Sequence, residues 1–176
     1  MKVGSPAIRK LMIYIKQHAI PEYLRTIGVP EGGVPDFFIQ AWAAVSERSN
    51  DTHVPHVHFS DGNALCSGVF YAQAPEGSGP LRFSDTRRTP CSEEYTEVPD
   101  EFFPGASYDY IPHTGDLLLF PPWAEHEVRP SLGIEPGRAR IVWAFNAVVL
   151  TGTADSGPAV VLTRDLHDLK IPISPN

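Results

Sequence analysis

Residues 115–130 read GDLLLFPPWAEHEVRP, and this stretch decides the fold class of the chain. A Gly-Asp turn signal precedes four apolar residues, 117–120, which form a short run typical of a buried strand. A Pro-Pro pair ends that run, since proline cannot donate to a strand ladder. His126 opens a second run and shares one face with Val128, because side chains alternate across a strand. The stretch therefore predicts two strands joined by a short connection.

Short runs of the same kind recur along the chain from residue 37 onward. Most are rich in β-branched or aromatic residues and are bounded by Gly, Pro, Asp or Asn, as strands are. The predicted strands are 37–47, 54–59, 64–74, 80–84, 116–120, 126–130, 140–150 and 159–164. Many short strands with few helices between them indicate an antiparallel sandwich or barrel.

One helical pattern precedes these strands and covers residues 5–28. Ser5, followed by a proline, is a good N-cap, and apolar residues at three- and four-residue spacing form one stripe. Pro21 is expected to kink or end the helix, so that residues 22–27 form a separate turn. Gly28 is a suitable stop signal. We expect a single domain over 1–176, with this helical region packed beside a β core of about 37–164.

The composition excludes several classes of partner. Lys and Arg total 14 and Asp and Glu total 21, so the net charge is −7, with no basic excess to bind nucleic acid. No apolar run approaches the roughly 20 residues of a membrane-spanning helix, and the N-terminus has no leader pattern. Two cysteines do not make a disulfide framework. We expect a cytoplasmic protein that binds neither nucleic acid nor membrane; its oligomeric state is unknown at this stage.

Histidine and arginine side chains within the predicted strands are candidates for chemistry. His56 and His58 are two residues apart, so on a strand they share a face and can chelate one metal ion. Surface histidines on a polar strand are the plainer interpretation. Arg140 lies in a strongly apolar strand, where a guanidinium needs an anion. A structural partner such as Glu127 or Glu135 would also satisfy it.

Three motifs occur in a recognisable order: PHVH at 55–58, SGVFY at 67–71, and GDLLLFPPW followed by His, Arg and Phe-Asn over 115–146. This order resembles the non-haem Fe(II), 2-oxoglutarate-dependent dioxygenases over about residues 40–147. It looks closest to a small bacterial and phage group of prolyl-hydroxylase-like proteins. The resemblance implies a mainly β fold, a double-stranded β-helix (a jelly roll or cupin-like barrel), with the N-terminal helix packed on one sheet.

The resemblance also implies a metal site. Fe(II) would be held by His56 and His126, with His58 standing where the family usually has a carboxylate. Three neutral imidazoles leave the site about one charge more positive than two imidazoles and a carboxylate. Asp61 is the alternative third ligand, if its loop folds back.

The same resemblance assigns the 2-oxoglutarate site. Arg140 matches the arginine that grips the distal carboxylate, and a planar guanidinium fork suits that task. Tyr71 matches a tyrosine that bonds the same carboxylate, although a core aromatic with a satisfied hydroxyl is the plainer interpretation. The usual Ser or Thr companion is replaced by Val142, so one hydrogen bond is lost or supplied elsewhere. Arg138 shares the strand face of Arg140 by parity and is the fallback.

The implied activity is an oxygenase that uses Fe(II), 2-oxoglutarate and O₂ and releases succinate and CO₂. Its expected substrate is an amino acid, a peptidyl residue or a small natural product, hydroxylated at an unactivated carbon. Substrate identity stays open, as does hydroxylation against desaturation or cyclisation. Two alternatives remain: a three-His cupin-type metal dioxygenase that does not use 2-oxoglutarate, and a non-catalytic jelly-roll binding module. The segment 85–112, rich in prolines and acidic residues, is expected to be a long surface excursion of the kind that forms a lid.

Overall fold

The protein is described from a computed structural model that covers most of the chain. The described residues are 5–48, 50–58, 63–85, 107–131, 133–135 and 137–150, with the backbone alone at 159–164 and 167–172. Asp61 and most of the excursion expected at 85–112 lie outside the described residues. Across the described part, no helix has both the length and the apolar character needed to cross a membrane.

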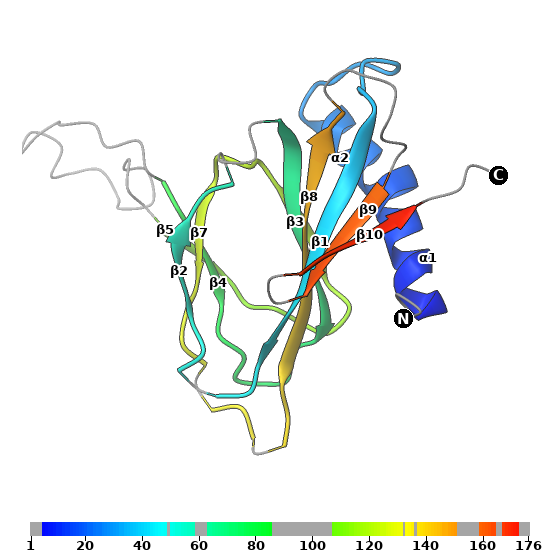
Figure 1. Ribbon diagram of the computed structural model, residues 1–176. Helices are drawn as coiled ribbons and strands as arrows, with labels where there is room; N and C mark the ends of the chain where they lie inside the picture. The colour runs from blue at the N-terminus through cyan, green and yellow to red at the C-terminus, as the bar shows by residue number, and fades with distance from the viewer. Residues whose placement is uncertain are drawn as a thin grey trace, which may run out of the picture.

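Two sheets face each other and make up the body of the molecule (Figure 1). One has the strand order β10-β9-β1-β8-β3-β6 and the other the order β2-β7-β4-β5. The strands are β1 (Phe37–Ser46), β2 (His53–His56), β3 (Ala64–Gln73), β4 (Leu81–Ser84), β5 (Ser107–Tyr110), β6 (Leu117–Phe120), β7 (Glu125–Val128), β8 (Arg140–Val149), β9 (Ala159–Arg164) and β10 (His167–Pro172). All described pairings are antiparallel except that of β1 with β9, which is parallel.

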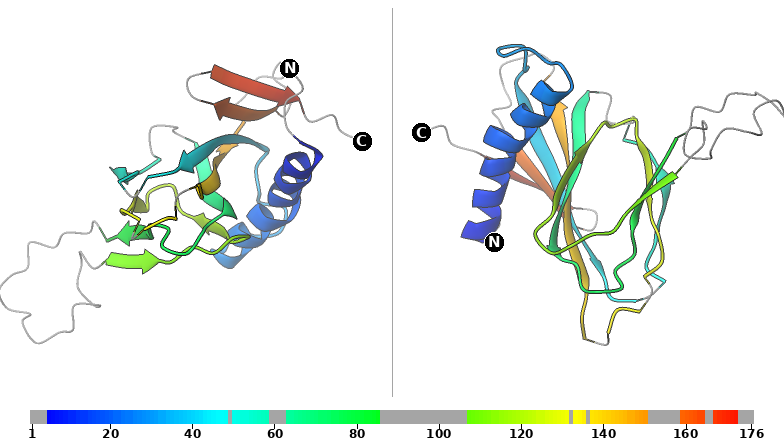
Figure 2. Two further views of the ribbon diagram at one scale, coloured as in Figure 1. Left: turned by 90° about the horizontal axis from the view of Figure 1, so that it is seen from below. Right: turned by 180° about the vertical axis from the view of Figure 1, so that it is seen from behind.

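The helical segment lies across the six-stranded sheet, on the side away from the four-stranded sheet (Figure 2). It consists of α1 (Pro6–Tyr14), a π-helical turn η1 (Ile15–Ala19) and α2 (Ile20–Thr26). As predicted, the Ser5 hydroxyl caps the N-terminus by accepting from the Ile8 amide at 3.4 Å. Gly28, with φ of +94°, follows its C-terminus.

The prediction that residues 22–27 form a separate turn is wrong, because the helical segment continues past Pro21 to Thr26. The irregularity expected at the proline takes the form of the π-helical turn directly before it, where the Ile20 amide donates to the Ile15 carbonyl. Proline has no amide hydrogen and its ring crowds the preceding turn. A widened turn relieves that crowding without ending the helix.

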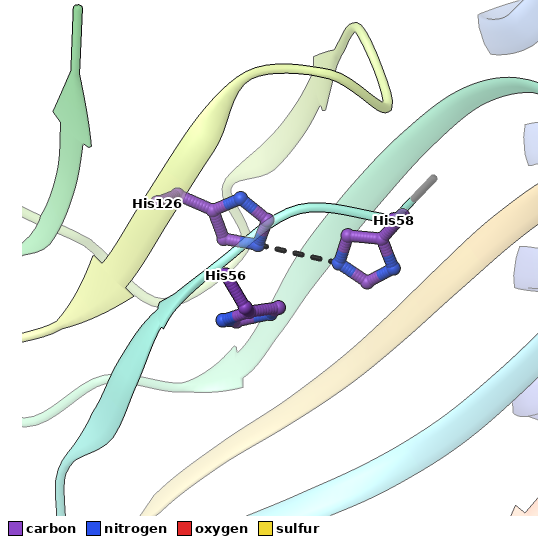
Figure 3. A group of neighbouring side chains, drawn as sticks. All are labelled: His56, His58 and His126. Atoms are coloured by element: carbon purple, nitrogen blue, oxygen red, sulfur yellow. Dashed lines mark hydrogen bonds between the residues drawn. The ribbon is translucent and has the colours of Figure 1, made fainter. Parts of the chain in front are cut away.

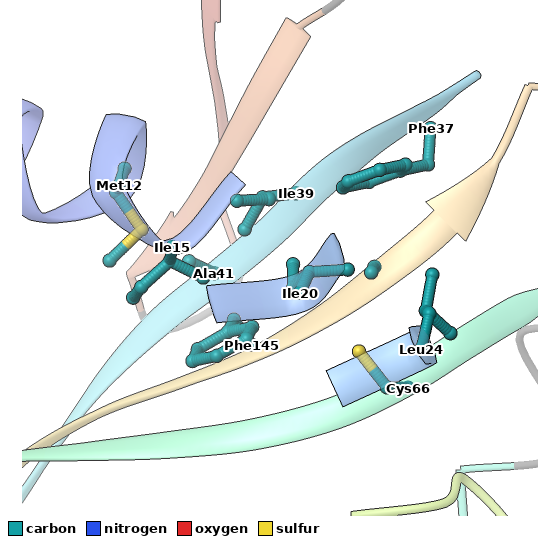
Figure 4. Close-up of a cluster of buried hydrophobic side chains, with 10 residues drawn as sticks. Met12, Ile15, Ile20, Leu24, Phe37, Ile39, Ala41, Cys66 and Phe145 are labelled. Carbon is teal, nitrogen blue, oxygen red and sulfur yellow. The ribbon is translucent and has the colours of Figure 1, made fainter. Parts of the chain in front are cut away.

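Alternation along the strands of the six-stranded sheet divides their side chains between two apolar layers. The outer layer packs the helices against the sheet and is drawn in Figure 4. Its buried residues are Met12, Ile15, Ile20, Leu24, Phe37, Ile39, Ala41, Cys66, Phe145 and Ala147. The inner layer, between the sheets, contains Val69, Tyr71, Leu81, Phe120 and Val142.

Gly68 in β3 is required by close packing rather than by its backbone angles. A Cβ at this position would lie 2.4 Å from Cζ of Phe145 and 2.8 Å from the carbonyl oxygen of Leu118. The ring of Phe145 therefore lies directly over the glycine, which accounts for the small residue in the SGVFY motif.

Candidate metal centre

Three histidine rings from two distant segments of the chain meet between the two sheets (Figure 3). His56 ends β2 and lies directly opposite His126 of the neighbouring strand β7. His58 follows two residues after His56, and one nitrogen of each of the three rings lies within 4.8 Å of the others. The structure thus brings together the three side chains that the sequence singled out.

The spacing of these nitrogens fits ligands of a single ion. Nε2 of His58 lies 3.3 Å from Nε2 of His126. Two nitrogens bound at about 2.1 Å to one ion are about 3.0 Å apart at a right angle and about 3.4 Å apart at a tetrahedral angle. The observed separation falls between these values.

Two of the rings are oriented by the same local device. Nδ1 of His56 lies 2.8 Å from the carbonyl oxygen of Val54, and Nδ1 of His126 lies 2.8 Å from that of Ala124. A ring nitrogen that donates to a carbonyl carries the proton of the neutral imidazole. Nε2 is then unprotonated, and its lone pair is free to bind a metal ion. Hydrogen bonds of this kind commonly orient metal-binding histidines.

His58 is positioned differently, and here the strand prediction needs correction. The strand β2 ends at His56, so His58 lies beyond it rather than on one strand face with His56. Its backbone amide donates to the carbonyl of Pro122 at 2.9 Å. Its ring stacks on Trp42 of β1, with centroids 6.0 Å apart and an interplanar angle of 25°.

Burial holds the imidazoles in the form that binds metal. It is the largest cause that lowers the pKa of His58 and of His126 to about 4, and the neighbouring histidines add to the effect. Both rings are neutral at pH 7 as a result. Metal ligation requires neutral imidazole, so the centre does not need to lose a proton from either ring before binding.

A cavity of about 300 Å³ lies beside these rings, between the sheets. It is lined by apolar side chains of both sheets together with the three histidines, His53, Ser46, Ser67 and Arg140. Asp51 is the only acidic side chain among the described residues that line it. Its Oδ2 accepts from the amides of Glu47 and Arg48 at 2.8 and 2.9 Å.

Arg140 and Tyr71 meet within the inner layer next to the cavity. Their exposed fractions are 4% and 0%, and the guanidinium carbon lies 5.2 Å from the centroid of the phenol ring. Burial raises the pKa of Tyr71, and the positive charge of Arg140 together with its interaction with the phenol hydroxyl opposes that rise. Within the described residues, neither Oη of Tyr71 nor Nε of Arg140 has a partner at hydrogen-bonding distance and angle, so the guanidinium is the nearest group that compensates the hydroxyl.

These two buried donors are suited to a carboxylate that would satisfy both at once. The structural partners considered for Arg140 are engaged elsewhere. Glu127 pairs with Arg129 at 3.3 Å, and Glu135 approaches Arg138 at 3.6 Å.

The prediction that Arg138 shares the strand face of Arg140 is wrong. The strand β8 begins at Arg140, so strand parity does not extend to Arg138. Its side chain is 62% exposed and lines a separate surface depression with Glu76 and Glu135.

His53 also lies in the site, although the sequence analysis assigned it no role. Its ring centroid is 4.2 Å from that of His56, and it lines the same cavity. Residues three apart on a regular strand face opposite ways, so parity argued against this pairing. The register of β2 shifts between His53 and His56, and only that irregularity lets both rings face the cavity.

Comparisons with known proteins agree with this geometry. A family model described as "Putative 2OG-Fe(II) oxygenase" matches residues 40–146. No match was found among curated proteins.

Two solved structures show the same fold. One is an oxidoreductase of the 2OG-Fe(II) oxygenase family from Burkholderia pseudomallei, with a TM-score of 0.55, 12% identity, and coverage of 83% of this chain and 60% of that one. The other is a Pseudomonas putida prolyl-4-hydroxylase, with a TM-score of 0.55, 17% identity, and coverage of 85% of this chain and 69% of that one. The double-stranded β-helix predicted from the motifs is confirmed. The chain spans about 60% of the length of the Burkholderia protein.

Proposed function

The chain belongs to this family of 2OG-Fe(II) oxygenases, and on that premise we propose that it hydroxylates an unactivated carbon of a small molecule or peptidyl residue. The observation that supports the proposal best is the joint placement of two groups of residues. Three neutral-nitrogen ligands converge in the lining of one cavity, and Arg140 of the same lining packs over Tyr71, so that two buried donors, Arg140 Nε and Tyr71 Oη, lie together. A metal ion would bind the histidine nitrogens, and a dicarboxylic acid would accept hydrogen bonds from the two donors.

We assign His56, His58 and His126 as the ligands of Fe(II). The fit rests on their nitrogen spacing and on the backbone carbonyls that direct Nε2 of His56 and His126 inward. Three ligands leave coordination positions for other oxygen donors, as in non-haem iron oxygenases. Fe(II) bound there, with 2-oxoglutarate and O₂, would supply the oxidation: one oxygen atom enters the substrate as hydroxyl and the other enters succinate, with release of CO₂.

We assign Arg140 and Tyr71 to the distal carboxylate of 2-oxoglutarate. The guanidinium can pair with both carboxylate oxygens, and the phenol hydroxyl can donate to one of them. Because both groups are buried, their bonds to an anion are little weakened by water.

Charge favours a doubly negative cosubstrate at this centre. Three neutral imidazoles leave the full charge of a divalent ion uncompensated, and Arg140 adds a further positive charge. Asp51, the single acidic residue among the described residues that line the cavity, already accepts hydrogen bonds from two backbone amides. The 2-oxoglutarate dianion would offset most of this excess.

The alternative that draws on a specific observation is a three-His metal dioxygenase that needs no 2-oxo acid. The all-histidine ligand set favours it. The unpartnered donors of Tyr71 and Arg140 disfavour it, because such an enzyme would have no use for a buried carboxylate site.

Succinate formation distinguishes these functions. Protein loaded anaerobically with Fe(II) is mixed with 2-oxoglutarate and O₂, alone and with pools of amino acids, peptides and small natural products, and succinate is measured. We expect slow succinate release alone and faster release with a true substrate. We expect none from the matched His126→Ala variant. Oxygen consumption by the iron-loaded protein without any 2-oxoglutarate would support the three-His alternative and overturn the proposal.

A further inference from the structure

We propose that His53 is a third donor to the distal carboxylate of 2-oxoglutarate. This inference rests on the proposed function and extends its cosubstrate site. Among the described residues that line the cavity, His53 is the histidine outside the metal centre.

The register of the four-stranded sheet places His53 in the row of paired residues next to the row that holds two of the metal ligands. The first row of paired residues runs His56, His126 and Phe83 across β2, β7 and β4. The next row runs His53, Val128 and Leu81. The first row carries two metal ligands, and the second begins with His53.

The second row packs against the inner layer of the facing sheet. Leu81 is buried there with Tyr71 and Val142, and Val128 packs against the same cluster, as Phe83 of the first row does. The guanidinium of Arg140 lies over the ring of Tyr71. His53 and Arg140 line the same cavity, so the imidazole borders the space that the guanidinium also borders.

Electrostatics agrees with this placement. After burial and the neighbouring His56, the positive charge of Arg140 is a further cause that lowers the pKa of His53. Both side chains line the same cavity, which is the geometry through which this charge acts. At neutral pH the ring keeps one N–H, which is a donor that an anion can accept.

A distal carboxylate would still have room for this donor. A carboxylate has about four lone-pair directions, of which a guanidinium fork uses two and a phenol a third. Val142, two residues after Arg140, is 4% exposed and offers no donor. A donor from the opposite sheet would complete the set.

Ser46 is the other neutral donor to consider, because it lies directly opposite Arg140 in the pairing of β1 with β8. The guanidinium, however, reaches toward Tyr71 of β3, and β3 lies on the other side of β8 from β1. The Ser46 hydroxyl is therefore on the wrong side of Arg140 and serves as a matched control.

His53 is also distinct from the metal ligands. The group whose nitrogens lie within 4.8 Å of one another contains His56, His58 and His126, and His53 is not a member. Its ring rests on His56 at a centroid distance of 4.2 Å. A test must therefore separate an effect on the carboxylate from an effect passed through His56 to the metal.

The experiment compares two 2-oxo acids that chelate metal in the same way. Calorimetry on the protein loaded with Mn(II) measures the dissociation constants of 2-oxoglutarate and of 2-oxobutyrate, which has no distal carboxylate. Wild type, His53→Ala, His53→Gln and Ser46→Ala are compared. His53 is exposed, so its variants are expected to fold, and thermal unfolding checks this.

We expect His53→Ala to weaken 2-oxoglutarate binding about tenfold, the size of one hydrogen bond to a charged group, and to leave 2-oxobutyrate binding unchanged. The His53→Gln variant, which keeps an N–H donor, should retain most of the affinity. The Ser46→Ala variant should bind both acids as wild type does.

Two results would overturn the inference. Equal weakening of both acids would show that His53 acts through His56 on the metal, and no weakening of either would show that it is a bystander. If wild type itself shows no preference for 2-oxoglutarate over 2-oxobutyrate, the proposed function fails and the inference fails with it. A preference that survives in His53→Ala overturns the inference alone.

Discussion

Replacing Tyr71 by Phe should change stability and binding in opposite directions. The Tyr71 ring is fully buried, and its hydroxyl oxygen has no hydrogen-bond partner among the described residues. The protein without cosubstrate therefore carries a desolvated polar atom that, in the described part of the chain, only the nearby Arg140 guanidinium compensates, without a well-formed hydrogen bond. The Tyr71→Phe variant removes that atom and keeps the ring.

The size of the stability change follows from what an unsatisfied buried polar group costs. Removing the Tyr71 hydroxyl should raise the free energy of unfolding by about 1–2 kcal/mol. In a chain of 176 residues, each kcal/mol raises the unfolding midpoint by about 2–4 °C. The same substitution removes one donor to the distal carboxylate and should weaken 2-oxoglutarate binding about tenfold.

Urea unfolding of the metal-free protein and calorimetric titration of the metal-loaded protein measure these two effects. Tyr110→Phe is the matched control, because the Tyr110 hydroxyl donates to Oδ2 of Asp116 at 2.7 Å. Its loss should destabilise the protein by about 1 kcal/mol and leave 2-oxoglutarate binding unchanged. The two tyrosine rings are 6.4 Å apart, so the variants probe one region.

A Tyr71→Phe variant that is less stable than wild type would refute this reasoning, because the hydroxyl would then be satisfied in the folded protein. Unchanged 2-oxoglutarate binding would refute the assignment of Tyr71 to the cosubstrate site. A gain in stability together with a loss of ligand affinity is typical of a binding site whose polar group has no partner until the ligand binds.

Three further predictions concern the cosubstrate arginine, the metal ligands and the packing of β3. Arg140→Lys should weaken 2-oxoglutarate binding by at least about tenfold in calorimetry, since an ammonium cannot form the paired bonds of a guanidinium; equal affinity would contradict the assignment. The pKa values of His58 and His126 are lowered to about 4 in the folded protein, so between roughly pH 6.5 and that value the unfolded chain binds more protons. Metal-free wild type should therefore lose more stability than His58→Ala between about pH 7 and pH 5 in urea unfolding, and equal losses would show that His58 is not held neutral. Gly68→Ala should lower the free energy of unfolding by about 1–3 kcal/mol, because its Cβ would lie 2.4 Å from Phe145; an unchanged urea midpoint would show that the ring moves freely.

The main strands could be predicted because their apolar runs and the turn residues that bound them indicate the same strand limits. The strand β6 occupies 117–120 as expected, and β1 and β8 match their predicted runs closely. The strand β5, SYDY, was missed because its residues are polar and exposed. Its pairing with β4 is supported instead by an ion pair between Arg82 and Asp109 at 2.6 Å. Such a contact between distant residues cannot be predicted from the sequence near either one.

The convergence of the three histidines was predicted from the resemblance of the motifs to the family, and the structure brings it about by pairing β2 with β7 so that His56 lies opposite His126. The position of His58 beyond its strand could not, because it depends on the contact with Pro122. The position of the His53 ring in the cavity depends on a register shift in β2. The alternation of apolar and polar residues in the sequence does not indicate that shift. Arg138 was misplaced because parity was carried past the start of β8.

The unpartnered hydroxyl of Tyr71 was likewise beyond sequence reasoning. A tyrosine among apolar residues usually finds a partner for its hydroxyl when buried. Only the arrangement of the surrounding strands shows that this one does not.

Metal content after anaerobic iron loading and desalting measures whether the three imidazoles hold one Fe(II). We expect one iron per chain in wild type and a large loss of iron in each of His56→Ala, His58→Ala and His126→Ala. A His56→Ala variant that retains as much iron as wild type would show that His56 is not a ligand.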